Sequence, residues 1–219
     1  MDAPDRLGVP SRARRREISE RYYRDDPGRF LGPPSAFAAW SRAFLDPLPR
    51  PVRLLELGCG PGRDARALAG PRVFVRAIDH APTAIARARA QPDPPPTLVL
   101  EEAEALDVLR SSPAGSLDAV YAHALYMFLG DEEVEAMVRE IARSLRVGGV
   151  HLFSVRSTAS PLARQGIELA PDVRLRADRE EAVRFYRAST LGRITDGLER
   201  VRAEERTDEC AWYVCDRRP

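Results

Sequence analysis

The sequence contains no lysine and no asparagine, so arginine supplies all of its positive side chains. The 34 basic residues nearly balance 33 acidic ones, which leaves a formal net charge of +1. So small a net charge gives no electrostatic reason to bind nucleic acid or an anionic membrane. The basic cluster 12–16 is followed by Glu17 and Glu20, which favours a solvated helix face over an RNA-binding patch. We therefore interpret the arginine bias as genome composition and expect neither partner.

Cysteine is also scarce. Cys59, Cys210 and Cys215 are odd in number and form no C-x-x-C pair, which argues against a disulfide framework and a zinc site. No apolar run reaches the roughly 18 residues of a membrane-spanning helix, and residues 1–10 lack the apolar core of a signal peptide. We expect a cytoplasmic protein without a bound metal, and the sequence leaves its oligomeric state open.

The length of 219 residues and the hydrophobic content of 44% fit one globular domain. We expect residues 1–50 to form a helical cap or lid, with helices over 11–24 and 35–45, and residues 51–219 to form the core. Tyr22 and Tyr23, near the end of the first helix, either fold over the site or serve only in packing.

The chain is organised around the stretch L-L-E-L-G-C-G-P-G-R-D at 54–64. An apolar run leads into Gly58, Gly60 and Gly62, and an alanine- and leucine-rich stretch follows. This pattern predicts a strand, a tight glycine turn and a helix start. Such a turn exposes backbone N–H groups and lets a ligand approach the main chain closely. We expect a cofactor to bind there.

Two acidic residues indicate which cofactor. The dinucleotide fingerprint G-x-G-x-x-G requires glycine where this chain has Arg63. Glu56, two residues before Gly58, would repel a pyrophosphate but suits an ammonium or sulfonium charge. Asp79 ends an expected strand over 73–78 and follows Gly58 by 21 residues, where a carboxylate can accept both ribose hydroxyls. The same side chain is also compatible with capping the helix expected over 82–91.

Strands alternate with helices through the middle of the chain. We expect strands at 52–57, 73–78, 97–100, 116–121 and 150–155, with intervening helices that include 82–91 and 131–145. We expect 156–177 to be irregular, then a helix that Asp178 and Glu181 begin as a capping box and that carries Phe185 and Tyr186. Strands at 198–206 and 210–217 form an antiparallel hairpin. The result is an α/β fold, a seven-stranded, mostly parallel sheet with helices on both faces.

The glycine motif, Asp79, the Glu102–Ala103 pair and the R-V-G-G turn at 146–149 together resemble the class I S-adenosylmethionine-dependent methyltransferases. More narrowly, Y-Y-R-D at 22–25, H-A-L-Y-M-F-L at 123–129 and R-E-E-A-V-R-F-Y at 179–186 resemble the small tellurite-resistance and thiopurine methyltransferases. The resemblance implies a Rossmann-like fold, S-adenosylmethionine as cofactor with S-adenosylhomocysteine as product, and a small-molecule methyl acceptor.

The same resemblance implies a set of site residues. Those expected to bind the cofactor are Tyr22, Glu56, Gly58, Cys59, Gly60, Gly62, Arg63, Asp79, His80, Glu102, Ala103, Ala122 and His123. A hydroxyl or amine acceptor needs a base, for which His123 and Tyr126 are the candidates, whereas a soft thiol or chalcogen anion needs none. Arg156 and Arg176 are candidates for binding an anionic substrate. A cofactor-binding module without turnover and an NAD-dependent oxidoreductase remain as alternatives.

Overall fold

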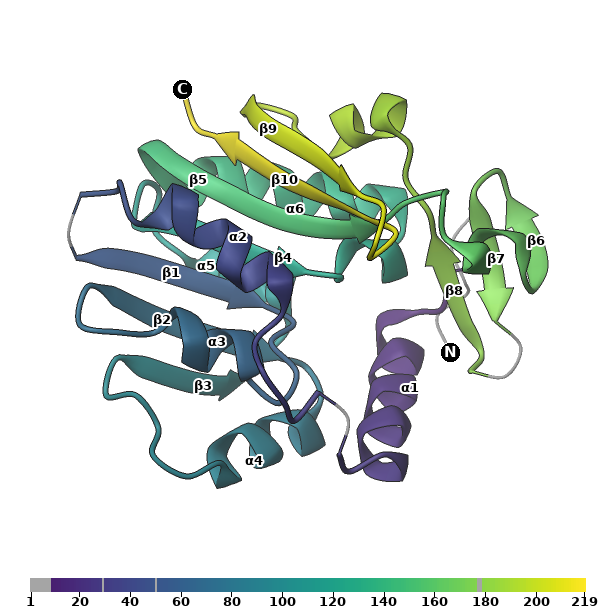
Figure 1. Cartoon of the computed structure of the whole chain (residues 1–219), viewed down its shortest axis with the longest axis horizontal. Helices are drawn as coiled ribbons and strands as arrows, with labels where there is room; N and C mark the ends of the chain where they lie inside the picture. The colour runs from purple at the N-terminus through teal and green to yellow at the C-terminus, as the bar shows by residue number, and fades with distance from the viewer. Residues whose placement is uncertain (1–8, 29, 50, 177–178) are drawn as a thin grey trace.

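The computed structural model describes residues 9–28, 30–49, 51–176 and 179–219. A seven-stranded sheet in the order β3-β2-β1-β4-β5-β10-β9 forms its centre (Figure 1). β1 to β5 are parallel, and β10 runs antiparallel to both β5 and β9. The expected sheet and its C-terminal hairpin are confirmed. The strands are β1 Val52–Leu57, β2 Val73–Asp79, β3 Leu98–Glu102, β4 Leu117–His123, β5 Leu145–Arg156, β9 Glu199–Arg206 and β10 Ala211–Arg217.

Helices cover both faces of this sheet. Buried side chains of α2, α3 and α4 pack on one face, and those of α5 and α6 pack on the other. In α6 the buried Val134, Met137, Val138 and Ile141 recur at three- and four-residue spacing, which gives the helix one apolar side. The helices are α1 Arg12–Asp25, α2 Ala36–Leu45, α3 Arg63–Leu68, α4 Pro82–Ala90, α5 Ala105–Ser111 and α6 Asp131–Ser144.

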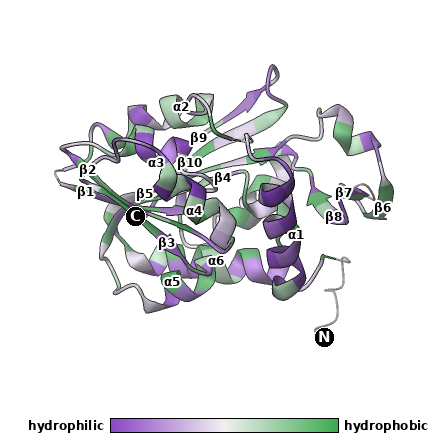
Figure 2. Ribbon diagram, turned by 90° about the horizontal axis from the view of Figure 1, so that it is seen from below, coloured by the Kyte–Doolittle hydropathy of each residue, from purple (hydrophilic) through white to green (hydrophobic). Residues whose placement is uncertain are grey.

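The strand order creates a crevice. The chain builds β1, β2 and β3 in one direction and then crosses to the other side of β1 for β4. The loops that leave β1 and β4 therefore turn apart at the carboxyl edge of the sheet, where ligands bind in open α/β folds. α1 lies across this edge (Figure 1) and is predominantly hydrophilic, in contrast to the strands (Figure 2).

A second, smaller sheet follows β5. It contains β6 Ile167–Ala170, β7 Val173–Arg176 and β8 Glu181–Arg184, all antiparallel. The expectations of an irregular segment and of a helix carrying Phe185 and Tyr186 were therefore wrong. Pairing with β7 makes this segment a strand, and Phe185 and Tyr186 are buried beyond its end. Of the expected capping box, Asp178 lies outside the described residues.

The R-V-G-G segment at 146–149 also differs from the expected turn. β5 already begins at Leu145, where the expected helix ends. Its pairing with β4 changes register between Leu117 and Ala119 of β4. A Cβ at Gly149 would lie 2.9 Å from the carbonyl oxygen of Arg146, so only glycine fits this irregular part of the strand.

Three 3₁₀ segments complete the fold: η1 Tyr126–Phe128, η2 Pro161–Arg164 and η3 Ala188–Ile194. Within the described ranges, no helix combines the length and apolar character needed to cross a bilayer.

Candidate functional site

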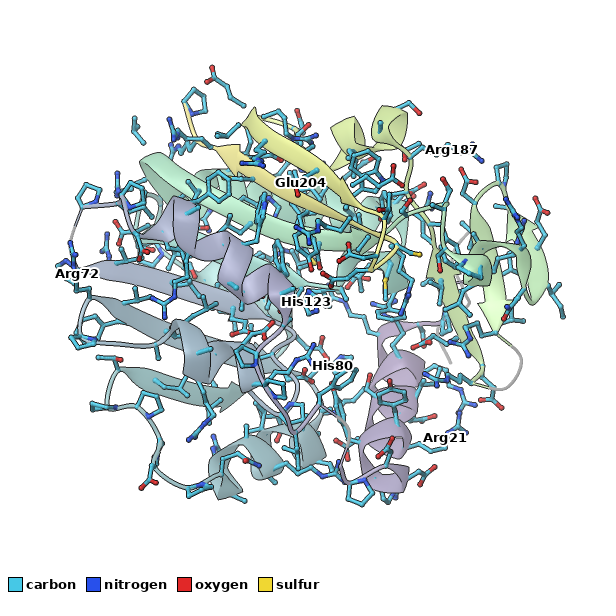
Figure 3. The ribbon with its side chains drawn as sticks, in the orientation of Figure 1. Arg21, Arg72, His80, His123, Arg187 and Glu204 are labelled. Atoms are coloured by element: carbon cyan, nitrogen blue, oxygen red, sulfur yellow. The ribbon has the colours of Figure 1, made fainter. Side chains whose placement is uncertain are left out.

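A cavity of about 660 Å³ lies at the carboxyl edge of the main sheet. The glycine turn, the ends of β4 and β5, α1 and residues of β8 line it. His80 and His123 come from different strand ends and both lie beside the space between the sheet and α1 (Figure 3). A cavity of this size, enclosed by segments far apart in the sequence, suits a small ligand.

The glycine turn brings bare backbone to the cavity. Gly60 has φ of +53°, and a Cβ there would lie 2.9 Å from the hydroxyl of Tyr23. Glycine at this position therefore serves both the left-handed backbone and the close approach of another group. The group that approaches here is Tyr23, and the ligand contact expected from the sequence stays a prediction.

Asp79 holds the turn in place. Its Oδ2 accepts a hydrogen bond from the N–H of Gly60 at 2.8 Å, and its Oδ1 accepts one from the N–H of Ala81 at 2.9 Å. Burial raises the pKa of Asp79, although the N–H groups of Ala81 and Gly60 favour its charged form. Because a carboxylate oxygen accepts about two hydrogen bonds, each oxygen keeps a lone pair for a ligand in the cavity.

Glu56 is the most unusual group in the cavity. Its side chain is only 2% exposed, and within the described part of the chain Oε2 has no hydrogen-bond partner. Burial, followed by the nearby carboxylates of Asp64 and Asp79, raises its pKa well above the ordinary value. An orphaned carboxylate oxygen in a cavity is costly unless a cationic or donor group of a ligand satisfies it.

Asp64, which the sequence did not suggest as a site residue, organises the same region. It accepts hydrogen bonds from the N–H and hydroxyl of Ser35, at 2.7 and 2.6 Å, and from the hydroxyl of Tyr121 at 2.8 Å. These contacts join the start of α2 and strand β4 to the first turn of α3. Its place two residues after Gly62, where an acid complements the helix dipole, was the available signal.

His123 is held from two sides. Its Nδ1 lies 2.7 Å from Oγ of Ser154, and its ring stacks on Phe37 with centroids 5.5 Å apart. Ser154 Oγ also accepts a hydrogen bond from the N–H of Ala124 at 3.1 Å, so its own proton can point to Nδ1. Burial lowers the pKa of His123 and keeps the ring neutral near pH 7. Ser154, a polar residue inside an apolar strand, was missed from the sequence.

Comparison with known proteins matches part of the chain to a family. Residues 54–149 match the profile of a family described as "Methyltransferase domain". This range contains the glycine turn, Asp79 and His123.

Residues 54–149 are therefore similar to a methyltransferase domain, as the class I S-adenosylmethionine-dependent resemblance led us to expect.

Curated relatives match less than half of this chain. A trans-aconitate 2-methyltransferase of Methylobacterium nodulans is 31% identical over 105 residues, which cover 47% of this chain and 38% of the relative. The chain spans about a third of the length of the first curated relatives that it matches.

Solved structures match over more of the chain. One, reported for the conversion of a disulfide bond into a thioacetal group during echinomycin biosynthesis, has a TM-score of 0.67 and 26% identity over 92% of both chains. The 1,6-didemethyltoxoflavin-N1-methyltransferase of Burkholderia thailandensis, solved with S-adenosylhomocysteine, has a TM-score of 0.68 at 16% identity over 100% of this chain and 93% of that chain. The expected methyltransferase-like fold is thereby confirmed. The narrower likeness to the tellurite-resistance and thiopurine type stays a prediction.

Most of the site residues expected for the methyltransferase lie around its cavity. These are Tyr22, Glu56, Gly58, Cys59, Gly60, Arg63, Asp79, His80, Ala103 and His123. Beyond them, Ser154 and Glu104 line the cavity without having been expected, and Glu104 lies 3.8 Å from Nδ1 of His80.

Tyr126 is not placed to act on a substrate. It is fully buried, and its hydroxyl lies 2.7 Å from Nε2 of His151 in the core beneath η1. Burial raises its pKa well above the ordinary value, which also disfavours the phenolate that a base would need. The interpretation of Tyr126 as a catalytic base is therefore corrected.

Three expected cofactor contacts do not line the cavity and stay predictions. Glu102 forms an ion pair with Arg16, and Ala122 is wholly buried in strand β4, so neither lines the cavity. Gly62 starts α3, and a Cβ there would meet Ala88 rather than the cavity. Ala103 does line the cavity, but its N–H already donates a hydrogen bond to the carbonyl oxygen of Asp79 at 3.0 Å.

Two sets of contacts hold α1 across the cavity. Glu20 accepts hydrogen bonds from the N–H and the hydroxyl of Thr83, at 2.8 and 2.6 Å, and so caps the start of α4. Ser19 Oγ lies 2.9 Å from Nε2 of His80. Tyr22 extends from the same helix into the cavity.

Proposed function

We propose that the protein transfers the methyl group of S-adenosylmethionine to a small-molecule acceptor. The observation that carries this proposal is the unpartnered carboxylate oxygen of Glu56 inside a cavity bordered by the glycine turn. Glu56 would bind the ammonium group of the cofactor, and the free lone pairs of Asp79 would accept its ribose hydroxyls. Pyrophosphate beside Glu56 would be repelled, which argues against the oxidoreductase alternative.

When bound, the cofactor supplies a sulfonium methyl group that moves to the acceptor nucleophile, and the bonding electron pair stays on sulfur. The protein contributes mainly by alignment and water exclusion, which can supply on the order of 7–11 kcal/mol. In our proposal α1 serves as the lid, with Tyr22 over the site. A soft anionic nucleophile loses no proton in this step. For a hydroxyl or amine, His123 is the candidate base, because its lowered pKa keeps it in the neutral form that a base requires.

The size of the cavity and the names of relatives support a small acceptor. The volume of about 660 Å³ falls within the range of small-molecule pockets. Relatives include trans-aconitate 2-methyltransferases and a phosphoethanolamine N-methyltransferase of Zea mays. Their names describe small-molecule acceptors, although the overlap covers only part of each protein.

The test begins with calorimetric titration of the purified protein with S-adenosylhomocysteine, with NADH as the control ligand. We expect micromolar binding of the first and none of the second. Glu56→Gln should weaken S-adenosylhomocysteine binding, whereas Glu101→Gln, a change on the exposed face of β3, should not. Binding of NADH alone would support the oxidoreductase, and binding of neither ligand would contradict the proposal.

A second measurement separates catalysis from binding. The protein and S-adenosylmethionine are incubated with a broad acceptor panel, and methylated products are sought by mass spectrometry. Binding without any product would favour the module that binds cofactor without turnover. If turnover is found, His123→Ala should alter its pH profile when His123 is the base and leave it unchanged when the ring only lines the cavity.

A further inference from the structure

Several arginine side chains line the cavity. Arg156 ends β5, Arg176 ends β7 and Arg179 precedes β8, and all three line the cavity. Glu56, Asp79 and Glu104 also line the cavity, as do Glu181 and Glu209. The cavity therefore offers both cationic and anionic side chains to a ligand.

Arg156 is the least compensated of these cations. Its side chain is half-buried, and across the described residues its guanidinium makes no hydrogen bond or ion pair within bonding distance. Burial lowers the pKa of Arg156, and the nearby charge of Arg176 lowers it further, while Glu181, Cys210 and Tyr22 act in the opposite direction. Arginine keeps its proton in proteins, so a bound anion would give this guanidinium the partner that the described residues do not supply.

Other cations around the cavity are already paired. Arg15 forms an ion pair with Glu133. Arg63 lies 3.8 Å from Asp64 and over the ring of Phe30. An incoming anion would therefore find its strongest unmet partner at Arg156.

Arg156 also lies on the same strand face as Ser154, which contacts the candidate base His123. Ser154 and Arg156 are two residues apart on β5, so their side chains leave the same face of the strand about 6–7 Å apart. Ser154 contacts His123. A group bound at Arg156 would leave the rest of a small molecule to extend toward His123 and the glycine turn.

Part of the cavity lining is apolar. Phe128, Val183, Phe185 and Leu162 line the cavity and belong to, or pack against, the core cluster on the α5 and α6 side of the sheet. An acceptor with one anionic end and an apolar body would satisfy both parts of this surface. A flat guanidinium binds a carboxylate through two parallel hydrogen bonds, a geometry that an ammonium cannot reproduce.

We infer that the acceptor is an organic anion whose carboxylate binds Arg156 while its apolar body packs against Phe128 and Phe185. The inference rests on the proposed function, because it assigns the second half of the same cavity. The carboxylate orients the acceptor, and the acidic groups beside the glycine turn prevent the reverse orientation by repelling it.

The test uses three carboxylates, benzoate, trans-cinnamate and hexanoate, and their neutral amides benzamide, cinnamamide and hexanamide. Each is titrated at up to millimolar concentration into the full chain saturated with S-adenosylhomocysteine. We expect at least one carboxylate to bind and its amide to bind at least tenfold more weakly, because hydrogen bonds to a charged group are strong. Equal binding of every acid and its amide, or no binding of any acid, would overturn the inference.

Variants then locate the binding. Arg156→Gln should weaken carboxylate binding by about tenfold or more, and Arg156→Lys should fall between it and the wild type, because lysine keeps the charge but loses the planar fork. Arg72→Gln is the matched control, since Arg72 is exposed and lies far from the cavity (Figure 3). An unchanged affinity in Arg156→Gln would overturn the assignment to Arg156.

Titration with S-adenosylhomocysteine distinguishes failure of this inference from failure of the proposed function. If S-adenosylhomocysteine itself does not bind the wild type, the proposed function fails, and the inference fails with it. If S-adenosylhomocysteine binds equally to wild type and Arg156→Gln but the acids behave like their amides, only the inference fails.

Discussion

Replacing Asp79 with asparagine probes the centre of the site. The carboxylate satisfies two buried backbone N–H groups, of Gly60 and of Ala81, with one oxygen each. Asparagine offers only one acceptor oxygen, so one of these N–H groups would face a donor NH₂ group instead. The substitution keeps the size of the side chain and therefore tests its hydrogen bonding rather than its packing.

The structure sets the expected loss of stability. One buried N–H left unsatisfied costs about 1–3 kcal/mol. Asparagine also removes a charge that is costly to bury, since desolvation raises the pKa of Asp79. This gain offsets part of the loss, so we expect a loss in the lower half of that range. For a chain of this size, 1 kcal/mol corresponds to roughly 2–4 °C in melting temperature, and the variant should melt about 2–8 °C lower.

Cofactor affinity provides the second readout. Ribose hydroxyls that donate to a charged carboxylate lose that partner in the amide, and we expect the Kd for S-adenosylhomocysteine to rise at least tenfold, equivalent to about 1.4 kcal/mol. Thermal melting without ligand and calorimetry with S-adenosylhomocysteine measure the two effects separately. Asp107→Asn, which changes a carboxylate that is 61% exposed on α5, is the control.

Two results would refute the reasoning. An unchanged melting temperature would mean that Asp79 does not hold the glycine turn. A lowered melting temperature with unchanged affinity would retain that structural role but remove the assignment to the ribose.

Three further predictions concern other contacts. Glu56 has a pKa well above 4.5 in the folded, ligand-free protein, so the unfolded chain releases this proton first as pH rises. The free energy of unfolding should therefore fall from about pH 4.5 toward neutrality. Denaturant titrations at several pH values should show a flatter decline for Glu56→Gln, and an identical slope would contradict the burial of this carboxyl. Tyr126→Phe removes a 2.7 Å hydrogen bond to His151 and should cost about 1–2 kcal/mol of unfolding free energy in urea while leaving the pH profile of turnover unmoved; a displaced profile would return Tyr126 to the reaction. Glu20→Ala removes both hydrogen bonds to Thr83 and should lower the free energy of unfolding by about 1–3 kcal/mol. Glu17→Ala breaks only an exposed ion pair with Arg14 on the same helix and should lower it by about 0.5 kcal/mol or less. Equal losses would show that Glu20 does not anchor α1.

The part of the site that could be predicted is the part encoded by local sequence. The apolar run before Gly58, the glycine spacing and the acid after the second strand all lie in short stretches whose backbone geometry follows from residue type. The expectation that Glu56 and Asp79 bind the cofactor came from these stretches. Both line the cavity, and the order of strands and helices around them follows the same local signals.

The errors occur where distant contacts decide. Tyr126 follows a strand at the expected distance, but its side chain turns into the core to meet His151. The segment with Phe185 carries a helix-start signal, yet pairing with β7 makes it a strand. In both cases a partner far along the chain outweighs the local pattern, and that partner cannot be identified from spacing alone.

The sequence by itself determined the sheet with its C-terminal hairpin and the glycine turn, because strand and helix periodicity and the conformational freedom of glycine are local properties. Only the tertiary structure decided what faces the cavity. It joined Ser154 to His123, Ser35 to Asp64 and Thr83 to Glu20, and it placed Arg156 in the same cavity as Glu56. Those pairings depend on how strands and helices pack, which fixes the direction of each side chain.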